Sequence, residues 1–161
     1  MRPRLILLLI LVHGFPLAAC AGLWTSDYES ALKKAKEENR HVLLDFSGSD
    51  WCGWCIRLQK EVFSTTAFQD FASKHLICVE IDFPRKTQLP QDIRERNFQL
   101  RKQFGVRGYP AIFLLGPDGV LVARTGYQAG GGEAYVSHLK DLIRRASDRT
   151  HPPDSAELSS P

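Results

Sequence analysis

Two cysteines three residues apart, Cys52 and Cys55, are the residues of this chain best suited to chemistry, and they stand in the run Trp51-Cys52-Gly53-Trp54-Cys55. Disulfide exchange needs a thiolate that attacks and a second thiol close enough to release the mixed disulfide. If Cys52 lies at the first turn of a helix, free backbone N–H groups and the positive end of the helix favour its thiolate. The spacing therefore predicts that Cys52 attacks and that Cys55 resolves.

A pair of thiolates can also bind Cu(I) or another soft metal ion, and such a metal-binding protein is the alternative to a redox enzyme. The chain has a single methionine and five scattered histidines, none at ligand spacing to a cysteine. A zinc site would lack its third and fourth ligands. We therefore expect no metal and no cofactor beyond the cysteines themselves. A redox-inert protein that uses its fold only to contact other proteins fits poorly, because both cysteines of the motif are present.

Two tryptophans and a third cysteine, Trp51, Trp54 and Cys78, can each be either functional residues or core residues. Trp54 is expected to form an exposed apolar rim for a flexible protein segment, whereas Trp51 is evenly balanced between such a rim and the core. Cys78 lies in the apolar run 76–79. We expect it to be a small buried hydrophobic residue, with a third redox thiol or a metal ligand as the alternative.

The elements that position the cysteines alternate between helix and strand, which indicates an α/β domain. Hydrophobic periodicity and turn residues predict helices at about 27–39, 52–63, 65–72, 91–104 and 133–146, and strands at about 41–46, 76–83, 111–115 and 120–125. The first helix begins with a capping-box pattern at Ser26. Asp50 is expected to cap the helix that carries the cysteines.

Length and charge limit the class of protein. With 161 residues and 43% hydrophobic content, the chain is long enough for one packed domain. Its formal charge is +3, and removal of a leader containing Arg2 and Arg4 would leave about +1. Acidic and basic residues are interspersed, so nucleic acid is not an expected partner.

Residues 1–19 have the pattern of a lipoprotein signal peptide, with a basic start and a short apolar run. The end of this segment, Leu17-Ala18-Ala19-Cys20, resembles a bacterial lipobox, in which Cys20 becomes the lipidated first residue and anchors the protein to a membrane. Ordinary signal-peptidase cleavage is the alternative. The lipoprotein interpretation gives a periplasmic location, with the outer membrane favoured over the inner. The domain is expected to span 20–146, followed by a disordered tail at 147–161.

The motifs together resemble the thioredoxin-like superfamily over about residues 24–146. The resemblance is closest to exported thioredoxin-like proteins and to the C-terminal periplasmic domain of transmembrane thiol reductases. It implies a thioredoxin-like fold with a central mixed β-sheet flanked by helices. The segments that carry it are Asp45-Phe46, Trp51-Cys52-Gly53-Trp54-Cys55, Gly105-Val106-Arg107-Gly108-Tyr109-Pro110, the following hairpin and Gly126.

The resemblance implies a thiol–disulfide oxidoreductase that acts on protein thiols and disulfides, with Cys52–Cys55 as its redox-active disulfide. Asp45 matches the buried acid that relays a proton, although an extra residue before Cys52 leaves a cap or turn as the alternative. Tyr109-Pro110 matches the cis-proline loop that holds the substrate backbone. The expected substrate-binding residues are Trp51, Gly53, Trp54, Tyr109, Pro110 and Gly126.

The motif leaves the direction of electron flow open, because Trp54 replaces the proline that the family usually has between the two cysteines. The motif also lacks the proline-histidine pair of strong oxidants, which favours a reductase or an isomerase. A membrane thiol reductase is the expected upstream partner.

Overall fold

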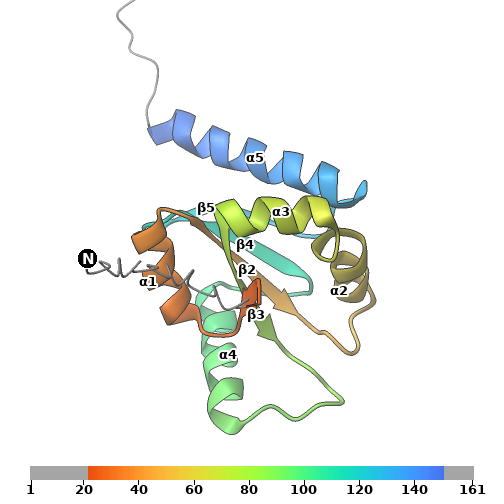
Figure 1. Ribbon diagram of the computed structural model, residues 1–161. Coiled ribbons are helices and arrows are strands. Elements are labelled where there is room, and N and C mark those ends of the chain that lie inside the picture. Colours follow the sequence, from red (N-terminus) through yellow and green to blue (C-terminus); the bar gives the residue numbers. More distant parts are fainter. Residues whose placement is uncertain (1–21, 151–161) are drawn as a thin grey trace, which may run out of the picture.

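The computed structural model describes residues 22–150, so the proposed signal peptide, Cys20 and residues 151–161 lie outside the described part. Five strands form one mixed sheet in the order β1-β3-β2-β4-β5 (Figure 1). The parallel pairs are β1/β3 and β2/β3, and the antiparallel pairs are β2/β4 and β4/β5. The expected mixed α/β sheet is confirmed. The strands are β1 (Trp24–Thr25), β2 (His41–Ser47), β3 (Leu76–Asp82), β4 (Ala111–Leu115) and β5 (Leu121–Thr125).

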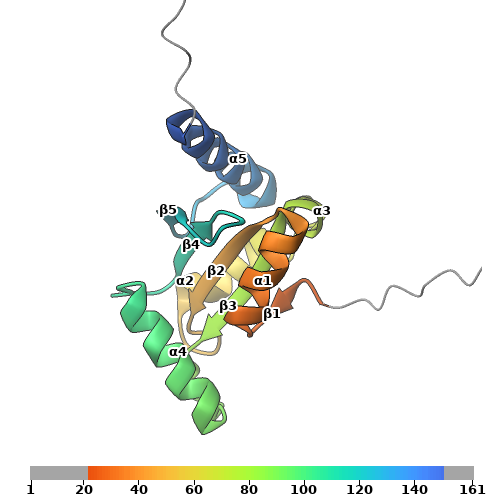
Figure 2. The same ribbon diagram turned by 90° about the vertical axis from the view of Figure 1, so that its left-hand side faces the viewer.

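Helices cover both faces of this sheet (Figure 2). One apolar cluster packs α1 and α4 against the sheet, and the other packs α2, η1, α3 and α5 against the opposite face. Figure 1 shows α3 and α5 lying along one another above the sheet. The helices are α1 (Tyr28–Glu38), α2 (Gly53–Leu58), the π-helical turn η1 (Gln59–Phe63), α3 (Thr66–His75), α4 (Gln91–Gln103) and α5 (Gly131–Thr150).

Strand β2 lies in the middle of the sheet and is buried on both faces, as its apolar sequence requires. Alternate residues of a strand point to opposite faces. Val42, Leu44 and Phe46 accordingly belong to the cluster beneath α1 and α4, whereas Leu43 belongs to the cluster beneath α2 and α5. Asp45 and Ser47 therefore point to the same side as Leu43, which is the side of the cysteine-bearing helix.

Several predicted boundaries are corrected. The N-cap of α1 is Asp27, which accepts a hydrogen bond from the Ser30 N–H at 3.1 Å, and not Ser26. Helix α5 begins at Gly131, next to Gly130 with φ +110°, and continues to Thr150, so the predicted disordered tail does not begin at residue 147. Strand β1 was not predicted, because two residues carry no periodic signal.

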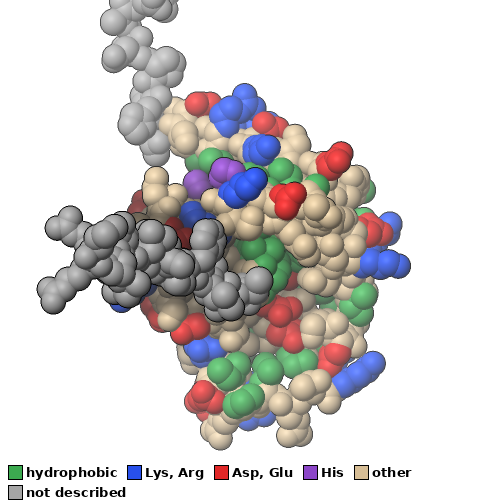
Figure 3. Space-filling model, in the orientation of Figure 1, with side chains coloured by type: hydrophobic (Ala, Val, Ile, Leu, Met, Phe, Trp, Pro, Cys, Tyr) green, Lys and Arg blue, Asp and Glu red, His purple; other side chains and the backbone are tan. Residues whose placement is uncertain are grey.

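The surface in Figure 3 shows Lys, Arg, Asp and Glu side chains interspersed over the visible face. None of the helices between residues 22 and 150 combines the length and apolar character needed to cross a membrane.

Candidate active site

Cys52 occupies the N-cap position of α2, in extended conformation at φ −84° and ψ 106°. Its sulfur accepts a hydrogen bond from the Cys55 backbone N–H at 3.3 Å, and its own N–H donates to the Gly48 carbonyl at 2.8 Å. The side chain is buried but retains 7% exposure. The Cys52 sulfur thus lies at the start of the helix, with a backbone N–H directed at it.

Cys55 lies one turn into α2 and is 4% exposed. Burial, and then its hydrogen bond with Cys52, raise the pKa of the Cys55 thiol to about 12. The Gly48 backbone and the Ser47 side chain act in the opposite direction and lower this pKa. Both cysteines are free thiols in the structure. Cys55 therefore needs a proton acceptor before it can attack.

Asp45 is the buried acid on the same side of the sheet, with 5% exposure. Burial, then the charges of Glu80 and Asp82, raise its pKa to about 8. Its Oδ1 atom is buried without a hydrogen-bond partner. It lies two residues before Ser47 on β2, so the extra residue before Cys52 does not turn Asp45 to the other face.

Two aspartates fasten the loop before Cys52 to the segment after β3. Asp82 accepts hydrogen bonds from the Ser49 N–H at 2.9 Å and hydroxyl at 2.6 Å. Asp50 accepts from the N–H groups of Arg85, Lys86 and Thr87 at 2.9, 2.7 and 3.3 Å. The prediction that Asp50 caps the cysteine-bearing helix is therefore wrong, because Cys52 takes that position.

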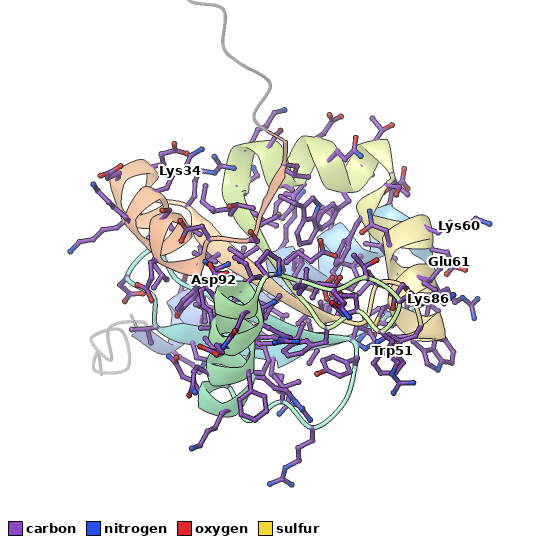
Figure 4. All side chains as sticks on the ribbon, turned by 90° about the horizontal axis from the view of Figure 1, so that it is seen from below. Lys34, Trp51, Lys60, Glu61, Lys86 and Asp92 are labelled. Carbon is purple, nitrogen blue, oxygen red and sulfur yellow. The ribbon has the colours of Figure 1, made fainter. Side chains whose placement is uncertain are left out.

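Trp51 joins this loop to the loop that carries Tyr109. Its indole N–H donates to the Phe83 carbonyl at 2.8 Å, and the Arg85 guanidinium lies 3.7 Å from its ring centre. Its ring meets Tyr109 edge to face, with centroids 5.8 Å apart. Figure 4 shows Trp51 and Lys86 at one end of the molecule. Trp51 is thus half-buried and forms a wall of the site.

Trp54, by contrast, is 55% exposed, as expected for a rim residue. Its ring lies 5.2 Å from that of Tyr127, and the Arg57 guanidinium lies 5.5 Å and 5.3 Å from the two ring centres. Glu61 fixes this group by pairing with Arg57 at 2.7 Å and accepting from the Tyr127 hydroxyl at 2.5 Å. An aromatic surface with a polar edge therefore borders the cysteines.

The Tyr109–Pro110 peptide bond is cis, as the resemblance implied. Gly126 lies against this loop, since a Cβ at Gly126 would be 3.5 Å from the Pro110 carbonyl oxygen. A Cβ at Gly53 would meet no atom within 4 Å, so Gly53 faces open space between the cysteines. The structure thus brings the predicted substrate-binding residues to one end of the sheet.

Cys78 is fully buried, and burial raises the pKa of its thiol to about 12. This agrees with a small core residue and gives no support to a third redox thiol. Within the described part of the chain, no three His, Cys, Asp or Glu side chains gather as a metal site would require. The soft-metal alternative gains no support from this arrangement.

Sequence reasoning missed Ser47, Glu80, Asp82 and Tyr127. A signal for two of them was available, because Glu80 and Asp82 alternate with apolar residues in β3 and share the face of Cys78. Their effect on Asp45 depends on β3 lying beside β2, and sequence periodicity alone does not predict which strands are neighbours.

Comparison with known proteins agrees with this geometry. The family described as thioredoxin-like domain matches residues 28–142. The disulfide bond reductase DsbH of Chlamydia pneumoniae is 40% identical over 129 residues, which are 80% of this chain and 77% of that protein. The solved structure of a DsbH oxidoreductase has a TM-score of 0.72 at 39% identity and covers 83% of this chain and 92% of its own. The thiol:disulfide interchange protein DsbD of Vibrio cholerae is 30% identical over 117 residues, which are 71% of this chain but 18% of that protein. The expected thioredoxin-like fold is confirmed.

Proposed function

Because the chain belongs to the thioredoxin-like family of thiol–disulfide oxidoreductases, we propose that it reduces disulfides of protein substrates outside the cytosol. The observation that carries this proposal is the dithiol at the start of α2, with Cys52 at the N-cap and Cys55 shielded behind it. The names of the relatives, a disulfide bond reductase and a thiol:disulfide interchange protein, support the chemistry.

The proposed reaction has two exchange steps. The Cys52 thiolate attacks a substrate disulfide, which forms a mixed disulfide and releases one substrate thiolate. Cys55 then loses its proton and attacks the Cys52 sulfur, which releases the second substrate thiolate and leaves Cys52–Cys55 as a disulfide. Asp45 accepts the Cys55 proton. Its raised pKa, about 8, lets a carboxyl both take and give a proton near neutral pH.

The substrate is proposed to lie as an extended segment along the Tyr109–Pro110 loop, with backbone hydrogen bonds of the strand-addition kind. Trp54 and Tyr127 provide apolar surface on one side, and Trp51 provides it on the other. Gly53 and Gly126, which lack side chains, leave room for the substrate backbone between these aromatic rings.

The test is reduction of insulin with dithiothreitol as electron source, together with two cysteine variants. The wild-type protein is expected to accelerate reduction, and Cys52→Ser to abolish it. Cys55→Ser is expected to trap substrate proteins on Cys52 as mixed disulfides. Wild-type protein that neither reduces insulin nor traps a partner would refute the proposal.

The proposed direction is reduction or isomerisation, fed by a membrane thiol reductase. A reduction potential near −270 mV, as in thioredoxin, would support it, whereas a value near −120 mV would indicate an oxidant. Recovery of a substrate with scrambled disulfides would separate an isomerase from a simple reductase.

We also propose that Cys20 is lipidated and anchors the protein to the outer membrane on its periplasmic side. The support is the sequence Leu17-Ala18-Ala19-Cys20 after a basic, apolar leader. Labelling with a radioactive fatty acid is expected to mark the wild-type protein and not Cys20→Ala. Unlabelled wild-type protein cleaved next to Cys20 would favour ordinary signal-peptidase processing.

A further inference from the structure

We propose that Glu80 is the outer member of a two-carboxyl relay that carries the Cys55 proton from Asp45 to water. The proposal rests on the proposed function and adds a residue to its second exchange step. It starts from the position of Glu80 on β3, directly beside Asp45 on β2.

The two carboxyls are register partners. Asp45 pairs with Glu80 in the parallel ladder between β2 and β3, so both side chains point to the face that carries α2. Neighbouring strands lie about 4.8 Å apart, so the two side chains are neighbours on this face of the sheet. The Oδ1 atom of Asp45 is buried and has no hydrogen-bond partner.

The pair leads from the interior to the surface. Asp45 is buried, whereas Glu80 is half-buried. Strand β1 covers the outer edge of β3 only at Cys78 and Val79 and therefore ends before Glu80. The Oδ1 atom of Asp45 is shielded from solvent, whereas the side chain of Glu80 is partly exposed.

The surroundings raise the pKa of both carboxyls, so each of them can take up a proton in turn. Asp82 on β3 repels both carboxylates, and burial disfavours each charge. The other titratable groups that feel the charge of Asp45 are Cys78 on β3 and Tyr135 on α5, which are neutral when protonated. Cys55 on α2 lies on the same side of the sheet, next to Ser47. Arg40 acts on Cys78, and neither carboxyl forms an ion pair with any of residues 22–150. Two carboxyls that interact strongly titrate in steps that belong to the pair and not to either residue.

The relay has three proton movements and no added reductant. The Cys55 thiol gives its proton to the Asp45 carboxylate, and the resulting thiolate attacks the Cys52 sulfur and displaces the substrate thiolate. Asp45 then passes the proton to the Glu80 carboxylate. Glu80 releases it to water, which restores the pair for the next turnover.

The experiment measures release of substrate from a preformed mixed disulfide on Cys52, in single turnovers over a range of pH. Relative to wild type, Glu80→Gln is expected to lower the maximum rate about three- to tenfold, since an acid–base group is lost. The rising limb is expected to move to lower pH, because removal of the Glu80 charge makes Asp45 easier to ionise. Acetate added to the buffer is expected to restore part of the rate, and Glu80→Asp to restore most of it.

Two controls keep the result specific. Glu37→Gln removes the same charge from the exposed face of α1 and is expected to leave the profile unchanged. Alkylation of Cys52 reports the first step and is expected to be the same in Glu80→Gln as in wild type.

A Glu80→Gln profile equal to wild type would overturn the relay, and so would a uniform loss of rate with neither a pH shift nor rescue by acetate. If Glu80→Gln folds poorly, the ¹³C carboxyl titration of the wild-type protein decides instead: coupled steps for Asp45 and Glu80 support the relay, and independent titrations refute it. A wild-type protein that fails to reduce any disulfide would refute the proposed function itself, which is a separate outcome.

Discussion

The indole N–H of Trp51 donates a hydrogen bond to the carbonyl oxygen of Phe83 at 2.8 Å. This bond ties the residue before Cys52 to the first residue after β3. Asp50 adds three hydrogen bonds to the same segment, at Arg85, Lys86 and Thr87. The wall of the site beside Cys52 therefore depends on a loop that is distant in sequence.

Asp50→Ala is expected to loosen residues 85–87. Three backbone N–H groups lose their shared acceptor, so their hydrogen exchange should accelerate about five- to tenfold. The KM for a protein substrate should rise as Arg85 leaves the Trp51 ring. Hydrogen exchange and steady-state kinetics measure the two effects. Asp70→Ala, an exposed aspartate on α3, is the control, and equal exchange in both variants would contradict the expectation.

Asp45→Asn is expected to stabilise the protein at high pH. The pKa of Asp45 is raised from 3.8 to about 8 by burial, so the folded state keeps a proton that the unfolded state loses between these values. Stability therefore falls as pH rises from about 4 to 8, and the asparagine removes this loss. The gain in free energy of unfolding should be near zero at pH 4 and about 2–4 kcal/mol at pH 8. Urea unfolding at both pH values measures it, with Asp70→Asn as the control. A gain independent of pH would show that Asp45 is not protonated in the fold.

The two tryptophans of the motif should respond differently to alanine. Trp54 is exposed, so Trp54→Ala should cost less than about 1 kcal/mol of stability while raising the KM for a protein disulfide. Trp51 packs on Gly48 and bonds to Phe83, so Trp51→Ala should cost about 2–3 kcal/mol. Unfolding curves measure the loss of stability in each variant. Kinetics with a protein disulfide and with a small disulfide measure the loss of substrate binding. Equal losses of stability would refute the distinction between rim and wall.

The repeating parts of the fold could be predicted from sequence, and the pairings between them could not. Apolar runs located β2, β3, β4 and β5, and helical spacing located the helices, because a buried face leaves a pattern in the sequence. Whether Asp50 capped its own helix or bound residues 85–87 depended on how a distant loop folds back. Both roles, capping a helix and accepting hydrogen bonds from a distant loop, suit an aspartate in a loop, so the sequence does not distinguish them.

The candidate site shows the same division. Cys52, Cys55 and Asp45 could be named as candidate site residues from the motif and its resemblance, and strand alternation placed Asp45 on the face of α2 once β2 was defined. Glu80 could not be assigned, because its pairing with Asp45 requires both the neighbour and the register of β3. One residue of slip would have turned Glu80 to the opposite face.

Cys78→Ala tests whether the third described cysteine takes part in redox chemistry. Cys78 is fully buried, and its thiol has a pKa raised to about 12, so it should form no mixed disulfide with a substrate. We expect the rate of insulin reduction to stay unchanged and the free energy of unfolding to fall by about 1–2 kcal/mol, because a small cavity replaces the sulfur. The matched comparison is Cys52→Ala, which should abolish the activity with little loss of stability. A Cys78→Ala protein that keeps its stability but loses activity would assign Cys78 a redox role after all.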